Sequence, residues 1–122
     1  MRRGLSHALI CVMLSLLSCS KERISGNGAT IIETRNIRNF TAISASGSTN
    51  VYIIQGTAFK VELKGFSNLL PYYETRLLNN TLHVGYKKNV NIKNDNIEVY
   101  LTLPVLNSLA LTGSGSITTT GS

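Results

Sequence analysis

The sequence is poor in the residues that build most active sites, metal centres and cross-links. Its 122 residues include two cysteines, two histidines and six acidic side chains. The carboxylates are scattered singly along the chain, at Glu22, Glu33, Glu62, Glu74, Asp95 and Glu98. Acid–base catalysis and cation-assisted cleavage both need clustered or paired carboxylates. The composition therefore predicts a protein that is not an enzyme.

The first nineteen residues, MRRGLSHALICVMLSLLSC, have the layout of a bacterial lipoprotein leader. Two arginines precede an apolar run, residues 8–17, that is too short to span a bilayer as a mature helix. The run ends in Leu-Leu-Ser-Cys, the pattern at which signal peptidase II cuts before the cysteine. We predict a signal peptide over residues 1–18 and lipidation at Cys19. The alternative is an ordinary signal peptide that happens to contain this cysteine.

Processing at this point has consequences for the rest of the chain. It removes Cys11 and leaves Cys19 acylated, so the mature chain contains no disulfide. Two or more acyl chains hold a protein on a membrane stably, because each buried methylene contributes about 0.8 kcal/mol. We therefore expect an outer membrane lipoprotein of the bacterial cell envelope, facing the periplasm or the surface. The polar segment 19–28 is expected to be a flexible tether to a folded domain over residues 29–122.

Beyond residue 29 the chain alternates apolar and polar residues, as half-buried strands do. In FKVELK the side chains of Phe59, Val61 and Leu63 share one face. The segments TLHVGY (81–86) and IEVYLTL (97–103) repeat the pattern. The sequence therefore predicts an all-β fold.

Two local signals interrupt these strands. Asn79-Asn80 separates two apolar stretches and predicts a β-hairpin, because asparagine tolerates positive φ. The stretch GFSNLLPYYE lacks the alternation and predicts one short helical turn near residues 67–73, which Pro71 keeps short.

The chain also contains an internal repeat. FTAISASGSTNV (40–51) aligns with LNSLALTGSGSI (106–117), and Gly47 and Gly113 fall at the same place. A glycine recurring after a strand marks a corner, and corners that stack are typical of a solenoid. We therefore predict a partial β-solenoid rather than a sandwich, with the Gly/Ser/Thr-rich tail as an ordered rung. Because the chain stops just after a corner, we expect a truncated product or a covering partner.

Three segments together resemble the head GIN domain family: residues 37–56, residues 59–87 and residues 97–117. The most specific parts are NLLPYYET and the corner motif LALTGSG. Members of this family are described as auto-transporter adhesins and are common among Bacteroidetes lipoproteins. The resemblance covers residues 29–122, the N-terminal part of the family domain. It implies a right-handed parallel β-helix-like fold, brings no functional residues with it, and implies that the C-terminal part of the domain is lacking.

Common ligand motifs are incomplete in this chain. Gly113-Ser-Gly115 lacks the third glycine of a dinucleotide loop, since Thr118 occupies that place. Calcium-binding repeats need an aspartate near each glycine pair, and the single aspartate, Asp95, is far from both corners. His83 has no companion ligands, so we predict no metal site. We also predict no cofactor and, for a lipid-anchored envelope protein, no nucleic acid partner.

A basic and aromatic surface is the remaining candidate site. Its residues are Tyr86, Lys87, Lys88, Lys93 and Tyr100. Tyrosine rings suit sugars, and lysines suit anionic glycans or lipid head groups. The alternative is a solvated, asparagine-rich loop. The resulting functional hypothesis is an adhesin-like module that binds glycans or surfaces. The alternative hypothesis is an envelope-assembly lipoprotein that pairs with another protein through an open β edge.

Overall fold

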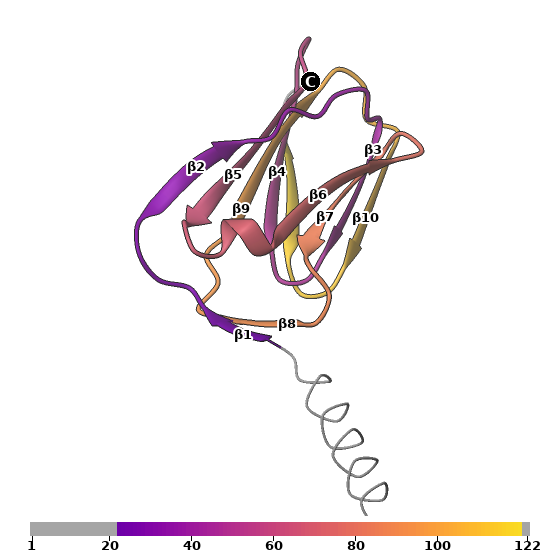
Figure 1. Ribbon diagram of the computed structural model, residues 1–122. Coiled ribbons are helices and arrows are strands. Elements are labelled where there is room, and N and C mark those ends of the chain that lie inside the picture. The colour runs from indigo at the N-terminus through magenta and orange to yellow at the C-terminus, as the bar shows by residue number, and fades with distance from the viewer. Residues whose placement is uncertain (1–21, 121–122) are drawn as a thin grey trace, which may run out of the picture.

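The computed structural model describes residues 22–120, in which every regular element is a strand except one 3₁₀ turn. The fold is all-β, as predicted (Figure 1). The elements in chain order are β1 (Glu22–Ser25), β2 (Thr30–Thr34), β3 (Ala42–Ser46), β4 (Asn50–Gln55), β5 (Lys60–Phe66), η1 (Leu70–Tyr72), β6 (Tyr73–Leu78), β7 (Thr81–Tyr86), β8 (Val90–Lys93), β9 (Glu98–Leu103), β10 (Ser108–Thr112) and β11 (Ser116–Thr120).

The strands form three sheets of mixed direction. In the five-stranded sheet, ordered β11-β4-β9-β5-β2, the first three strands are parallel and the last two are antiparallel to their neighbours. In the four-stranded sheet, ordered β10-β3-β7-β6, only β6 is antiparallel. Strands β1 and β8 form a small parallel pair at one end of the molecule (Figure 1).

The core lies between the inner faces of the two larger sheets. The predicted alternation is confirmed here, since Val61, Leu63 and Leu101 are buried while the residues between them are not. Facing them from the four-stranded sheet are Ile43 and Leu82, which are also buried. Each such aliphatic side chain contributes about 1.5–3 kcal/mol when it leaves water. This packing fixes which residues point outward on both sheets.

The two glycine corners stack as the repeat predicts. β10 pairs with β3 and β11 pairs with β4 at the same shift along the chain, so that Leu109 lies beside Ile43. The N–H of Gly47 donates to the carbonyl of Thr112 at 2.8 Å, and the N–H of Gly115 donates to the carbonyl of Gly47 at 3.1 Å. The Gly/Ser/Thr-rich tail is therefore ordered as far as Thr120, with the corner at residues 113–115 between β10 and β11.

The two local predictions are also confirmed. β6 and β7 form an antiparallel hairpin whose turn residues, Asn79 and Asn80, have φ values of 51° and 65°. Both values lie in the left-handed region, which a two-residue turn of this kind requires. The 3₁₀ turn falls inside the expected 67–73 stretch, with its proline at the start.

The prediction of a parallel β-helix-like solenoid agrees with the structure only at the two stacked corners. Strands β2, β5 and β6 are antiparallel, and the sheets do not close into a coil. For β6 the reason is the two-residue hairpin, because a connection this short can join only antiparallel neighbours. The architecture within residues 22–120 is therefore an all-β fold with mixed sheets.

The N-terminal assignments fall largely outside the described residues. Cys19 and the predicted signal peptide are not part of residues 22–120, so the boundaries 1–18, 19–28 and 29–122 stay predictions. Part of the expected tether does have regular structure, because residues 22–25 form β1. That strand is held by its parallel pairing with β8.

Candidate functional site

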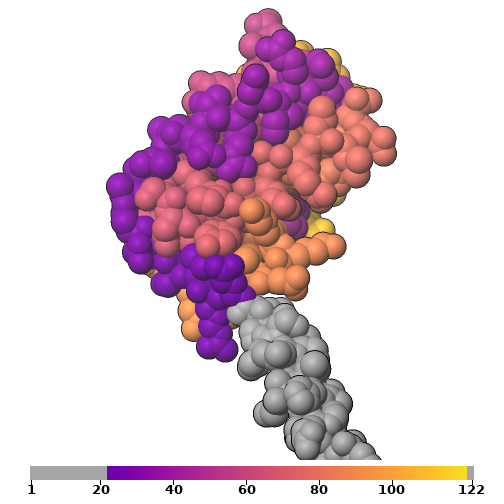
Figure 2. Space-filling model, viewed as in Figure 1, coloured from indigo at the N-terminus to yellow at the C-terminus, as the bar shows by residue number. Residues whose placement is uncertain are grey.

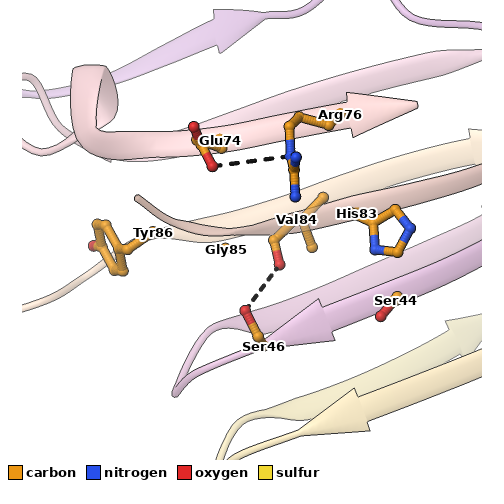
Figure 3. A pocket seen from close by; sticks show the side chains of 8 residues that line it. All are labelled: Ser44, Ser46, Glu74, Arg76, His83, Val84, Gly85 and Tyr86. Carbon is orange, nitrogen blue, oxygen red and sulfur yellow. Dashed lines mark hydrogen bonds and ion pairs between the residues drawn. The ribbon is translucent and has the colours of Figure 1, made fainter. Parts of the chain in front are cut away.

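A polar hollow lies on the outer face of the four-stranded sheet (Figure 3). Strand pairing puts Arg76, His83 and Ser44 side by side, in one row across β6, β7 and β3. Glu74 lies beside Gly85 in the next row, on the same face. All these side chains point outward because the residues between them, such as Leu82 and Val84, fill the core.

Gly85 shapes the floor of this hollow. A Cβ at this position would collide with the hydroxyl of Ser46 on the neighbouring strand, so a larger residue would fill the space. The Ser46 hydroxyl donates to the carbonyl of Val84 at 3.5 Å. The resulting cavity has a volume of about 130 Å³, below the range of about 300–1,000 Å³ typical of small-molecule pockets. It can receive only part of a ligand, such as a portion of one ring.

The hollow offers both signs of charge. Arg76 Nε lies 3.9 Å from Glu74 Oε1, and the two side chains are 67% and 40% exposed. The guanidinium donates no hydrogen bond to any residue in the described range, so its donors are free for a ligand. Ser44 and His83 are adjacent, but no hydrogen bond joins them, and no carboxylate of residues 22–120 accepts a hydrogen bond from the imidazole. The arrangement suits recognition of hydroxyls and anions, and it lacks an activated nucleophile.

A second polar feature lies on the outer face of the five-stranded sheet. Tyr52 and Tyr100 stack on adjacent strands with ring centroids 5.1 Å apart and planes 17° apart. The hydroxyl of Tyr100 donates to Glu98 Oε1 at 3.0 Å, and that of Tyr52 approaches Glu98 Oε2 at 3.5 Å. The hydrogen bond to the carboxylate raises the pKa of Tyr100, because ionisation would place two negative charges together.

The predicted basic and aromatic residues do not all come together. Lys87, Lys88 and Lys93 are exposed at the end of the molecule that carries β1 and β8. Tyr86 immediately precedes them but is half-buried. Tyr100 lies on the outer face of the five-stranded sheet, away from this group.

Tyr86 has a structural partner on each side. Its ring packs edge-on against Tyr73 with centroids 5.0 Å apart, and its hydroxyl donates to Asp95 Oδ1 at 2.7 Å. Burial, and then the bond to Asp95, raise the pKa of this phenol. Tyr86 therefore joins the core to Asp95, which also accepts the hydroxyl of Ser48 in the corner at Gly47. Asp95 is distant from this corner in the sequence but lies beside it in the fold.

That corner contains a larger hollow of about 560 Å³, lined in part by Ser48, Lys64 and Asp95. Asp95 Oδ1 also accepts the N–H of Ile97 at 2.9 Å, and Oδ2 accepts the Ser48 hydroxyl at 3.3 Å. The carboxylate is thus engaged in holding the corner, which leaves little for a ligand.

Sequence reasoning missed the hollow of Figure 3 as a site. The alternation indicates that His83 points outward, and the Asn79-Asn80 turn predicts that β6 flanks β7, but nothing in the sequence shows that β3 flanks β7 on the other side. Between residues 22 and 120, no group of three His, Cys, Asp or Glu side chains could hold a metal ion. In the same range no helix is long and apolar enough to cross a membrane.

Comparison with known proteins gives the family. A family model described as "Putative auto-transporter adhesin, head GIN domain" matches residues 39–122. No curated protein matches the chain.

Solved structures of similar fold come from species of Bacteroides and Parabacteroides. A "putative adhesin" from Bacteroides fragilis has a TM-score of 0.71 and 22% identity over 76% of this chain and 44% of its own. One from Parabacteroides merdae has a TM-score of 0.70 and 22% identity over 77% and 40%. A "putative lipid binding protein" from Parabacteroides distasonis has a TM-score of 0.73 and 22% identity over 81% and 44%.

The chain spans less than half the length of each of these three proteins, and identities at this level show the shared fold alone. The family model covers more than half of the chain and includes the stacked corners at Gly47 and Gly113. The expected resemblance is therefore confirmed, and the chain belongs to the head GIN domain family.

Proposed function

We propose that this chain is a non-enzymatic, lipid-anchored protein of the bacterial cell envelope that binds surface glycans in the manner of an adhesin. The family description and the names of the similar structures support an adhesin-like or lipid-binding role. The predicted acylation of Cys19 would place the protein at the outer membrane. Incorporation of labelled palmitate, lost in Cys19→Ser, tests the anchor separately from ligand binding.

The observation that carries glycan binding is the chemistry of the hollow in Figure 3. A sugar ring presents adjacent hydroxyls that both donate and accept hydrogen bonds. Glu74 can accept from such hydroxyls while Arg76 donates to them, and Ser44 can do either. The volume of about 130 Å³ admits a portion of one ring. This size suits repeated weak contacts with a polymer, which is how a surface adhesin holds its target.

A glycan array tests this function with a matched pair of variants. Hydrogen bonds to a charged group contribute about 1.5–3 kcal/mol, so Arg76→Ala should lower affinity about 10- to 100-fold. Arg38→Ala removes the same charge from an exposed loop outside the hollow and should leave affinity unchanged. Glycan binding that both variants retain, but that Lys87→Ala/Lys88→Ala abolishes, would move the site to the basic loop. Absence of glycan binding by the unaltered chain would reject the proposal.

A second function is favoured by the unpaired edge of the fold. β10 and β11 each have one neighbour in their sheets, and the inward-facing Leu109 and Leu111 are 42% and 39% exposed. Beside Leu109 a hollow of about 320 Å³ opens towards the core residues Ile53 and Leu103. Such an edge can accept a strand from another envelope protein, with backbone hydrogen bonds giving affinity and the apolar hollow giving selectivity.

Site-specific cross-linking distinguishes this second function. A photo-crosslinker at Thr112 should capture an envelope protein in cells, and Leu109→Ser/Leu111→Ser should abolish the capture. Leu78→Ser is the control, because Leu78 is an equally apolar residue, 57% exposed, on the edge strand β6. Loss of capture in the control would show that the contact is not specific to the β10–β11 edge.

The proposal includes the architecture of the longer relatives. The parallel pairing of β10 on β3 and of β11 on β4 supports reading these corners as rungs of a right-handed β-helix-like solenoid. Further rungs stacked on β10 and β11 would bury Leu109 and Leu111. A longer form of the chain would then expose these two leucines less than residues 22–120 do alone.

A further inference from the structure

The β1–β8 end of the molecule carries a group of four exposed cations, Arg23, Lys87, Lys88 and Lys93, which we name the basic end. The pairing of β1 with β8 brings them together, since Glu22 lies opposite Val90 and Ser25 lies opposite Lys93. The N–H of Glu22 also donates to the carbonyl of Asn89, the residue after Lys88. This end forms the lower surface in Figures 1 and 2, where indigo and orange residues meet.

The cations point away from the core. Ile24 on β1 and Ile92 on β8 pack against the hydrophobic cluster, so the neighbouring positions on both strands face outward. Arg23 and Lys93 occupy two of these outward positions. Their charges therefore project from the end of the molecule into the surroundings.

The four cations of the basic end take part in no ion pair within residues 22–120. The ion pairs in this range use Arg35, Lys60 and Arg76 instead. Two carboxylates, Glu22 and Asp95, lie close by and keep their negative charges, so the four cations leave this end with two net positive charges. Both carboxylates accept hydrogen bonds from uncharged groups and not from these cations. Glu22 accepts the Tyr72 hydroxyl at 3.1 Å, and Asp95 is bound by Tyr86, Ile97 and Ser48.

The sequence separates this end from the predicted lipid attachment by very little chain. Glu22, the first residue of β1, follows Cys19 by three residues. Three residues span at most about 10 Å even when fully extended. An acyl group on Cys19 would therefore keep the basic end within about 10 Å of the bilayer surface. At physiological ionic strength charges interact over about 8 Å, so the cations would lie within reach of the head groups.

We propose that the basic end docks on the anionic phosphate head groups of the membrane that holds the acyl chains. This proposal rests on the lipid anchor of the proposed function and adds an orientation to it. With β1 and β8 against the bilayer, the opposite end of the sheets, with the Asn79-Asn80 turn, points away from the membrane (Figure 1). The outer faces of both sheets, including the hollow of Figure 3, are then roughly perpendicular to the membrane surface and remain accessible to ligands.

Vesicle binding without acylation tests the docking directly. The chain from residue 19, with Cys19→Ser, keeps the core, because the buried apolar side chains of residues 22–120 all lie between Phe40 and Leu103. It should bind vesicles of phosphatidylcholine containing phosphatidylglycerol at least tenfold more tightly than vesicles of phosphatidylcholine alone. The preference should fade towards 1 M salt, where the screening length falls to about 3 Å.

Charge-matched variants locate the surface. A basic residue near an anionic bilayer contributes about 1 kcal/mol, so Lys87→Ala/Lys88→Ala/Lys93→Ala should lower binding to the anionic vesicles about a hundredfold. Arg38→Ala/Lys60→Ala/Lys64→Ala removes the same net charge from other surfaces and should change binding less than threefold. Equal loss in both triple variants, or equal binding to both kinds of vesicle, would overturn the proposal. Failure of palmitate labelling at Cys19 would instead remove the anchor and leave the vesicle result standing.

Discussion

The stacked corners predict that alanine at two equivalent glycines has unequal effects. Gly47 and Gly113 have φ values of 84° and 116°, so alanine is strained at both positions. That strain costs about 1–2 kcal/mol. A Cβ at position 47 meets nothing within 4 Å, whereas a Cβ at position 113 lies 2.5 Å from the carbonyl oxygen of Gly47. Moving this backbone adds about 1–3 kcal/mol, so Gly113→Ala should cost about 2–5 kcal/mol in all.

Hydrogen exchange resolved by strand measures the difference. β10 and β11 are edge strands, so Gly113→Ala can detach them while the rest of the core survives. We expect the amides of β10, β11 and Gly115 to exchange at least tenfold faster than in Gly47→Ala, with a smaller change in β9. If Gly47→Ala loosened these strands as much as Gly113→Ala, the overlap of the two corners would not be what holds the last pair of strands.

Two further predictions concern the interior. Arg35 donates hydrogen bonds to Glu33, to the carbonyls of Tyr73 and Leu70 and to the Thr75 hydroxyl. In urea titrations Arg35→Ala should therefore lower the free energy of unfolding by about 2–4 kcal/mol, and Arg35→Lys should restore less than half of that loss. Burial raises the pKa of Tyr73 to about 12 from 10.0, so the stability it contributes is full below pH 10 and is lost as pH rises from 10 towards 12, by about 2–3 kcal/mol. Because its buried hydroxyl has no hydrogen-bond partner in residues 22–120, Tyr73→Phe should leave neutral stability unchanged or higher. It should also make this part of the pH profile shallower, while Tyr86, whose pKa is raised too, retains its own share of the loss. An unaltered profile would contradict the assignment.

The sequence predicts the parts of this fold that depend on local pattern. The inward positions of β5 and β9 follow from strict alternation, and the Asn79-Asn80 turn follows from the tolerance of asparagine for positive φ. The match between residues 40–51 and residues 106–117 gives the pairing register of four strands, because equivalent corners stack in parallel.

Features that depend on non-local pairing could not be predicted. The row Arg76–His83–Ser44 exists only because β7 lies between β6 and β3. The Asn79-Asn80 turn encodes the β6–β7 pairing, but no local pattern encodes the pairing of β7 with β3. β1 is four residues long and mostly polar, so the sequence does not indicate that it is a strand or that it pairs with β8. Leu109 faces inward as expected, yet it is 42% exposed because β10 is an edge strand.

The place of β3 and β4 in their sheets has a consequence for how the chain is made. Both are central strands, but their neighbours, β7 and β9 on one side and β10 and β11 on the other, all come later in the chain. During synthesis, which starts at the N-terminus, β3 has no neighbour until β7 has been produced at residue 86, and β4 has none until β9 has been produced at residue 103. Their other edges stay bare until β10 and β11 follow. Contacts between such distant positions close slowly. The nascent chain is therefore most vulnerable to aggregation in the segment 42–55, before its first stable neighbour arrives.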